Sequence, residues 1–283
     1  MMQKLYGRFP VHGAFQKIII LSISMLVGAA SLAAGSKAVE LRSNNPEKAH
    51  DRPEIIGALG VGDLMPGSGE LGVTNSETDF LVQPNKNNWN VFGAQAGVGY
   101  IHYFPGALQY SENLQWFPSI EPELNAYYLG QETFSGDVWR FNNRVFNEMT
   151  YTMSIQSVRL MADGALTIIS KKKFSLYAIG GIGNAWNYLS YSDTDNANAA
   201  PCPDQGLNLG KNIHSSFAWE VGGGITYTYN PRILLSLEYL YADLGRTETS
   251  ASGNTGTITT PHIISAQFNL NSQAILAGLH VTL

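Results

Sequence analysis

Strict alternation of large apolar residues with small or polar ones is the feature that most constrains this chain. In Ser216–Tyr229, every second residue is aromatic, aliphatic or glycine, and the residues between them are small or polar. The pattern restarts in Ile233–Ala242, after the turn signal Asn230-Pro231. Successive side chains of a β-strand point to opposite faces, so a period of two predicts strands. The two segments therefore predict a β-hairpin with one apolar face.

The same alternation recurs along the chain and predicts eight strands. They are expected at Glu54–Gly62, Trp89–Phe104, Ser119–Gly130, Ser157–Ile169, Phe174–Asn187, Ser216–Tyr229, Ile233–Ala242 and Ala274–Leu283. The connections at 105–118, 171–173 and 230–232 are short or modest, whereas those at about 63–88, 131–150, 188–213 and 244–271 are long and polar. Because short and long connections alternate, an up-and-down meander places all long loops at one end, which is typical of outer-membrane barrels.

The composition decides which face of these strands is buried. Only 14% of the residues are charged, against about 25% in an average soluble protein. The non-apolar face is therefore too poor in charge for the outside of a soluble sandwich, and its Gly, Ala, Ser, Thr and Asn suit a crowded interior. Backbone groups in lipid must be paired, so the sheet must close. We expect an all-β, eight-stranded antiparallel up-and-down transmembrane barrel with short periplasmic turns, four long extracellular loops and a filled lumen.

The N-terminus reads as a targeting segment. Lys4, Arg8 and Lys17 precede the apolar stretch Ile18–Ala30, which is followed by small residues. This order predicts a cleaved signal peptide over residues 1–35, with a permanent transmembrane anchor as the alternative. Residues 36–53 are expected to be a polar periplasmic lead-in, and residues 54–283 a single barrel domain.

Several function classes are excluded by composition. The chain has 17 Lys and Arg against 22 Asp and Glu, a net charge of −5, and lacks the basic stripe of a nucleic-acid-binding protein. Its single cysteine, Cys202, cannot form an internal disulfide or a thiolate cluster. The six histidines show no metal-ligand spacing, and the glycine-rich stretches Gly57–Gly72 and Gly180–Gly183 lack phosphate-loop motifs. We therefore expect no metal, no cofactor and no nucleic-acid partner, and we interpret these glycines as residues for close packing.

Three segments carry a resemblance to a known family. Glu238–Gly245, Gly222–Pro231 and the closing Gln273–Leu283 resemble small outer-membrane barrels of the opacity-protein and OmpA-membrane-domain type. The resemblance implies a location in the outer membrane of a Gram-negative bacterium, contact with outer-membrane lipid and lipopolysaccharide, and insertion by the barrel-assembly machinery. Members of that class usually end in Phe or Trp, whereas this chain ends in Leu283.

Charged residues whose position in the alternation predicts an inward-pointing side chain form the candidate site. They are Glu121, Glu123, Arg159, Asp163, Glu220 and Glu238. Buried carboxylates need hydrogen-bond or ion-pair partners, or else take up protons. The favoured interpretation is a hydrogen-bonded network that fills the lumen and fixes strand register. The alternative is a narrow cation or proton pathway lined by these acids.

The expected function follows from a rigid barrel that displays polar loops. We expect a surface protein that serves envelope structure or adhesion to a host or other ligand. The alternatives are a narrow ion-conducting pore and an outer-membrane lipid-modifying enzyme. His214 and Ser216 lie two residues apart where a predicted strand leaves the long loop 188–213. Outer-membrane lipid-modifying enzymes use a His and a Ser with this spacing on a strand, but the pattern here places no orienting acid beside them. The chain is therefore not expected to be an enzyme.

Overall fold

The structure is a computed structural model that describes residues 51–74, 77–84, 89–104, 108–111, 114–147, 149–195, 206–255 and 265–283. Every described residue belongs to one compact unit, His50–Leu283. The predicted signal peptide and most of the predicted lead-in lie outside the described residues. No described helix has the length and apolar character needed to cross a bilayer.

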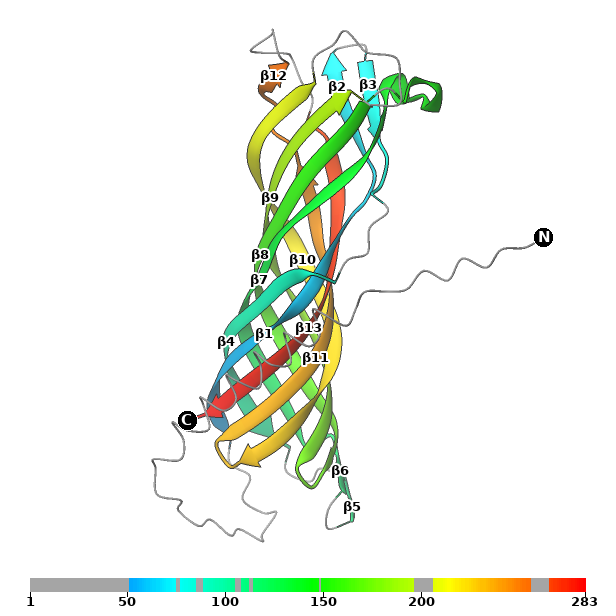
Figure 1. The fold of residues 1–283 in the computed structure, drawn as a ribbon. Helices are drawn as coiled ribbons and strands as arrows, with labels where there is room; N and C mark the ends of the chain where they lie inside the picture. Colours follow the sequence, from blue (N-terminus) through cyan, green and yellow to red (C-terminus); the bar gives the residue numbers. More distant parts are fainter. Residues whose placement is uncertain are drawn as a thin grey trace, which may run out of the picture. The chain divides into compact units, whose positions relative to one another are not determined.

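Eight long antiparallel strands close into a ring (Figure 1). Each pairs with its neighbours in chain order, β7 pairs with β8, and the first long strand pairs with the last. The ring strands are β1 (Arg52–Pro66), β4 (Val91–Tyr103), β7 (Ser119–Trp139), β8 (Met149–Lys171), β9 (Phe174–Asp195), β10 (Leu207–Asn230), β11 (Ile233–Glu248) and β13 (Gln267–Thr282). This arrangement confirms the predicted eight-stranded up-and-down barrel.

The four long loops were predicted too long. Ring strands occupy much of the segments assigned to them, because β7 runs on to Trp139, β8 begins at Met149 and β10 begins at Leu207. Shorter elements account for other parts of the connections. They are β2 (Gly69–Thr74), β3 (Glu77–Leu81), β5 (Leu108–Ser111), β6 (Leu114–Trp116), β12 (Gly253–Thr255) and the 3-10 helices η2 (Arg140–Asn142) and η3 (Arg144–Phe146). The structure thus has a barrel that continues well beyond the predicted strands at the end opposite the short turns.

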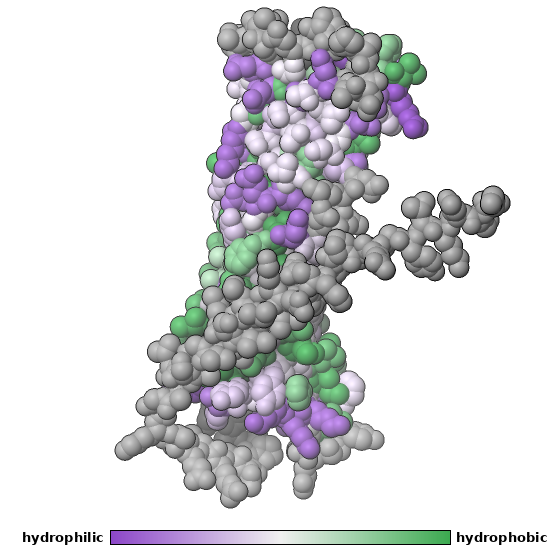
Figure 2. Space-filling model, viewed as in Figure 1, coloured by the Kyte–Doolittle hydropathy of each residue, from purple (hydrophilic) through white to green (hydrophobic). Residues whose placement is uncertain are grey.

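An apolar belt surrounds the half of the barrel nearest the short turns. Outward side chains there are large, exposed and apolar, for example Phe217 at 64% exposure, and Figure 2 shows apolar residues gathered around this lower part. Aromatic pairs mark both edges, with Phe174 against Tyr227 near the turns and Trp219 against Tyr241 farther up. The segment of β10 from Trp219 to Tyr227 has the length of a strand that crosses a bilayer core, which is roughly 9–11 residues. The belt is therefore the lipid-facing surface of a transmembrane barrel.

Polarity inverts above this belt. On β8, the inward residues Tyr151, Met153 and Ile155 are buried and apolar, whereas the inward residues Arg159 and Asp163 of the belt are charged. The outer face of the same upper part carries Thr, Ser, Gln and Asn on β7 to β10, which Figure 2 shows as weakly to strongly hydrophilic. The upper part is therefore built like a water-soluble protein, with an apolar core inside a polar surface. We call this part the extension.

β-bulges lie where the two parts meet. Register shifts separate Leu129 from Glu132 on β7, Leu209 from Asn212 on β10, and Asp243 from Arg246 on β11. An extra residue in one strand reverses which residues face inward beyond it. On β7 the buried positions accordingly change from odd to even numbers. The bulges keep the apolar residues of the extension inside the barrel.

Candidate functional site

The lumen of the belt holds the six residues that the sequence singled out. Their side chains come from four strands: Glu121 and Glu123 from β7, Arg159 and Asp163 from β8, Glu220 from β10 and Glu238 from β11. Five of them are buried, and Glu121 is half-buried. The structure therefore places the predicted set on the inward face, in two neighbouring clusters.

Arg159 is the central cation of the first cluster. Its Nε donates to Glu220 Oε2 over 2.9 Å, and both side chains are buried. Its guanidinium also lies 4.2 Å from the ring centroid of Tyr127. The Coulomb attraction within a buried ion pair is strong, but removing both charges from water is costly. The net contribution of the pair to stability therefore depends on its geometry. The pair joins β8 to β10 across the intervening strand β9.

Amide and phenol groups donate hydrogen bonds to one oxygen of each of three further lumen carboxylates. Asn125 Nδ2 donates to Glu123 Oε2 over 2.7 Å and to Asp163 Oδ2 over 2.8 Å. The Tyr127 hydroxyl donates to Asp163 Oδ2 over 3.2 Å. On the neighbouring strands, the Tyr177 hydroxyl donates to Glu238 Oε2 over 2.9 Å. Asp163 Oδ1, Glu220 Oε1 and Glu238 Oε1 have no hydrogen-bond partner, so the contacts form a partly satisfied network. That this network fixes strand register stays a prediction.

Glycine on β9 lets side chains from β8 and β10 meet. Asp163 and Glu220 both lie opposite Gly181 in register. A Cβ on Gly181 would overlap the Asp163 carboxylate and lie 2.9 Å from the carbonyl oxygen of Ala162. The glycine-rich stretch therefore provides the close packing inside the narrow barrel that the sequence indicated.

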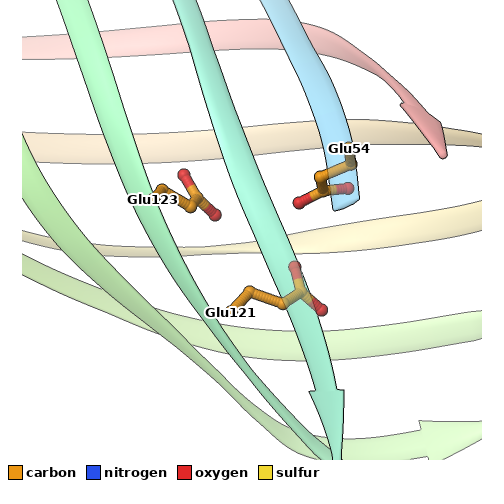
Figure 3. Close-up of side chains that lie close together, drawn as sticks. All are labelled: Glu54, Glu121 and Glu123. Atoms are coloured by element: carbon orange, nitrogen blue, oxygen red, sulfur yellow. The ribbon is translucent and has the colours of Figure 1, made fainter. Parts of the chain in front are cut away.

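A second cluster near the short turns includes residues that the sequence analysis did not single out. His280 Nδ1 lies 3.3 Å from Glu54 Oε2, and its Nε2 lies 3.1 Å from Ser236 Oγ. All three side chains are buried. Glu121 and Glu123 lie close to Glu54 (Figure 3). The alternation in the last strand could have identified His280 as an inward-pointing residue. The alternation around Glu54 is too short to show on which face of the strand its side chain lies.

The extension closes the lumen above these clusters. Side chains from four strands are fully buried there; they are Leu64, Phe134, Met153, Ile155, Leu189 and Tyr191. Farther out, the Asp193 carboxylate accepts hydrogen bonds from the Leu207 backbone N–H over 2.6 Å and the Tyr191 hydroxyl over 2.9 Å. Burial raises the pKa of Asp193 above its usual range, and these two donors offset part of that rise. Apolar packing therefore separates the polar lumen from the outer end.

The His214 and Ser216 pair does not form the dyad that the enzyme alternative requires. His214 Nδ1 lies 3.1 Å from Glu248 Oε1, so an acid does contact the imidazole. The Ser216 hydroxyl instead donates to the backbone carbonyl of Arg246 over 2.8 Å. A nucleophilic serine needs a hydrogen bond to its base, and this hydroxyl is directed elsewhere. Cys202 lies outside the described residues.

An exposed knob projects from the outer end of the barrel. It consists of Arg140–Phe146, the segment of η2 and η3 between β7 and β8, seen in green beside β3 in Figure 1. Val145 is 83% exposed, and the rings of Phe141 and Phe146 meet edge to face at 5.8 Å. The Arg140 guanidinium lies 5.4 Å from the centroid of the Phe141 ring, and that of Arg144 lies 5.8 Å from the Trp139 ring. The knob combines apolar and cationic groups.

Comparison with known proteins gives structural neighbours. No family model and no curated protein sequence matches the chain. The outer membrane protease OmpT from Escherichia coli aligns with 84% of this chain and 100% of its own, at 11% identity and a TM-score of 0.44. Neisserial surface protein A aligns with 83% of this chain and 99% of its own, at 10% identity and a TM-score of 0.32. The attachment invasion locus protein Ail of Yersinia pestis aligns with 81% of this chain and 99% of its own, at 9% identity and a TM-score of 0.31. The assignment of this chain as an outer-membrane barrel rests on its own closed ring and apolar belt.

Proposed function

We propose that the protein is an outer-membrane surface protein that binds a ligand outside the cell through its outer rim, with the barrel as scaffold. The observation that carries this proposal is the knob, where Phe141, Val145 and Phe146 are exposed beside Arg144. Exposed apolar patches next to polar groups are typical of interaction sites. Aromatic residues and arginine are also the residues that dominate binding energy at interfaces.

The extension supports the proposal because it raises the knob above the membrane. On β8, the residues from Met149 to Ser157 lie beyond the belt. At about 3.3 Å per residue, they span roughly 30 Å along the strand. The apolar core of the extension holds these strands together without help from lipid. A rigid stalk of this kind suits recognition of a partner beyond the lipopolysaccharide headgroups.

The knob is also held in a defined conformation. Phe141 and Asn142 both have a φ of 54°, in the left-handed region that non-glycine residues rarely adopt. The Phe141 backbone N–H donates to Asp79 Oδ1 over 3.1 Å, and the Val145 N–H donates to Asn143 Oδ1 over 3.0 Å. Strained backbone persists where the surroundings impose it, often at functional sites. A preformed surface loses less conformational entropy when a partner binds.

The ion-pore alternative has less support. An aqueous path needs polar groups along its whole length, but the described interior of the extension is apolar at Met153, Ile155 and Leu189. The lumen acids of the belt therefore end at an apolar barrier. A conducting state would require this core to open.

The test is adherence of bacteria that display the full chain to epithelial cells and to immobilised sulfated glycans and serum proteins. The variant Phe141→Ser/Val145→Ser/Phe146→Ser is expected to lose most binding to one of these surfaces. Ser135→Ala, on the exposed outer face of β7, is the control and should bind normally. Both variants should keep the faster-migrating unboiled band of a folded barrel. Equal binding by both variants, with detergent sensitivity on gene loss, would instead assign the protein to envelope structure.

A further inference from the structure

Three carboxylates converge in the lumen near the short turns. Glu54 comes from β1, and Glu121 and Glu123 come from β7, with one oxygen of each lying within 4.8 Å of the others. Figure 3 shows the three side chains directed into the same space. Ca²⁺ takes carboxylate oxygens at about 2.3–2.6 Å, so two ligands on opposite sides of the ion lie about 5 Å apart. The spacing therefore fits a calcium-sized ion without movement of the backbone.

An orphaned oxygen points into this space. The Glu54 side chain has 0% exposure, and its Oε2 contacts His280, but its Oε1 has no hydrogen-bond partner. A buried carboxylate oxygen that lacks a donor destabilises the fold. The contact with His280 accounts for one oxygen only. A cation between Glu54 and its two neighbours would satisfy the other.

Gly99 on β4 creates the space in which the carboxylates meet. It lies opposite Glu54 on one side and opposite Glu123 on the other. A Cβ at this position would lie 2.9 Å from Glu54 Oε1 and 3.2 Å from Glu123 Cγ. Side chains from β1 and β7 thus meet over a glycine of the strand between them. The arrangement repeats that of Asp163, Gly181 and Glu220 elsewhere in the lumen, where a cation, Arg159, binds Glu220.

The charges of the lumen call for such a cation here. The acids of the described belt lumen are Glu54, Glu121, Glu123, Asp163, Glu220 and Glu238, and the bases are Arg159 and His280. Arg159 is already bound to Glu220. Arg52, at the mouth, donates to the Pro231 carbonyl and the Tyr103 hydroxyl. Glu121 has one hydroxyl contact, with Ser119 at 3.5 Å. The base that contacts the three-carboxylate cluster is the imidazole of His280, through Glu54.

We propose that Glu54, Glu121 and Glu123 bind a divalent cation of the Ca²⁺ type, which enters from the periplasmic end. The apolar extension blocks the opposite route. The bound ion would join β1 to β7 across β4, close to the seam between the first and last strands. It would thereby stabilise the closed ring, and this role does not depend on ligand binding by the knob.

The experiment measures Ca²⁺ binding to the full barrel in phosphatidylcholine vesicles, which lack anionic headgroups. Calorimetry should give one site per barrel, and the urea midpoint should rise in Ca²⁺ relative to EDTA. Glu121→Gln should weaken Ca²⁺ affinity at least about tenfold. Glu238→Gln is the matched control, because it removes a lumen charge outside the cluster and should retain the affinity. Absence of binding, or equal weakening by both variants, overturns the site.

A second measurement keeps the proposal testable if a variant fails to fold. Mn²⁺ bound to the unaltered barrel should broaden the backbone amide signals of Gly99 and Glu123 in nuclear magnetic resonance spectra, and Ca²⁺ should reverse the broadening. Signals of Gly181, in the other cluster, should broaden less. Uniform broadening, or broadening confined to the exposed termini of strands, would show an adventitious ion only and contradict the proposal.

Discussion

Arg159 and Glu220 form an ion pair across β9, at 2.9 Å, with 3% and 0% of their side chains exposed. The strand between them offers Gly181 opposite Glu220, so no side chain intervenes there. The pair consequently links strands that are not hydrogen-bonded to each other. It helps to fix the cross-section of the belt, as does the hydrogen bond from Tyr177 on β9 to Glu238 on β11.

Loss of the cation in this pair should destabilise the barrel strongly. Arg159→Ala leaves the Glu220 carboxylate buried without its partner, which costs about 3–5 kcal/mol. We expect a lower urea midpoint in vesicles and a less heat-resistant folded band on gels. The double variant Arg159→Ala/Glu220→Ala should recover part of the loss. An unchanged folded band in the single variant would argue against a tight network.

A methyl group at Gly181 should disrupt the lumen. Gly181→Ala places a Cβ against the Asp163 carboxylate, and overpacking of this kind costs about 1–3 kcal/mol. Gly57→Ala is a matched control, because an added Cβ there meets nothing within 4 Å. The urea midpoint should fall for the first variant and stay close to the wild-type value for the second. Similar midpoints for both would contradict the packing described here.

The extension should lose stability separately from the belt. Ile155 is fully buried, and Ile155→Ala removes apolar contacts worth about 2–5 kcal/mol. Amide hydrogen exchange should accelerate on the upper parts of β8 and β9 but not around Leu160 in the belt. Thr152→Ala, on the exposed face of the same strand, is the control. Uniform acceleration along β8 would show that the two parts unfold together.

The outer end should become less stable as the pH rises through the acid range. Burial raises the pKa of Asp193 above its usual 3.8, so the folded state favours the neutral carboxyl. This preference is fully present below pH 3.8 and is lost as the pH rises through the folded-state pKa. Carboxyl carbon shifts should report a midpoint above 3.8, and Tyr191→Phe should raise it further by removing a donor. A midpoint at or below 3.8 would contradict the burial of this group.

Sequence patterning was sufficient for the belt and insufficient for the extension. In the belt, lipid outside and a crowded lumen inside impose a two-residue period that survives in each strand, as in Phe217 to Tyr229. In the extension the apolar residues switch to the inner face. Bulges such as that between Leu129 and Glu132 also change which residues, odd-numbered or even-numbered, point inward. Neither the outward direction of apolar residues nor a fixed alternation therefore continues from the belt into the extension. These strand segments therefore read as polar loops.

The candidate site was only partly visible for a related reason. Parity placed Arg159 and Glu220 inside, but it does not tell which inward residues of different strands lie at one height. That depends on register, which brings Glu54 and Glu123 to either side of Gly99. The short alternating segment around Glu54 left its direction open. The partners Asn125 and Tyr177 are neutral and gave no charge signal.

The division of the barrel into a belt and an extension depends on the inversion of polarity along β8. Spin labels attached at Leu160 and at Thr152 of β8, in a Cys202→Ser background, both face outward from the barrel. In vesicles, the label at 160 should collide mainly with lipid-soluble oxygen, and the label at 152 with a water-soluble nickel complex. Equal access of the nickel complex to both positions would contradict a lipid-facing belt beneath a water-exposed extension.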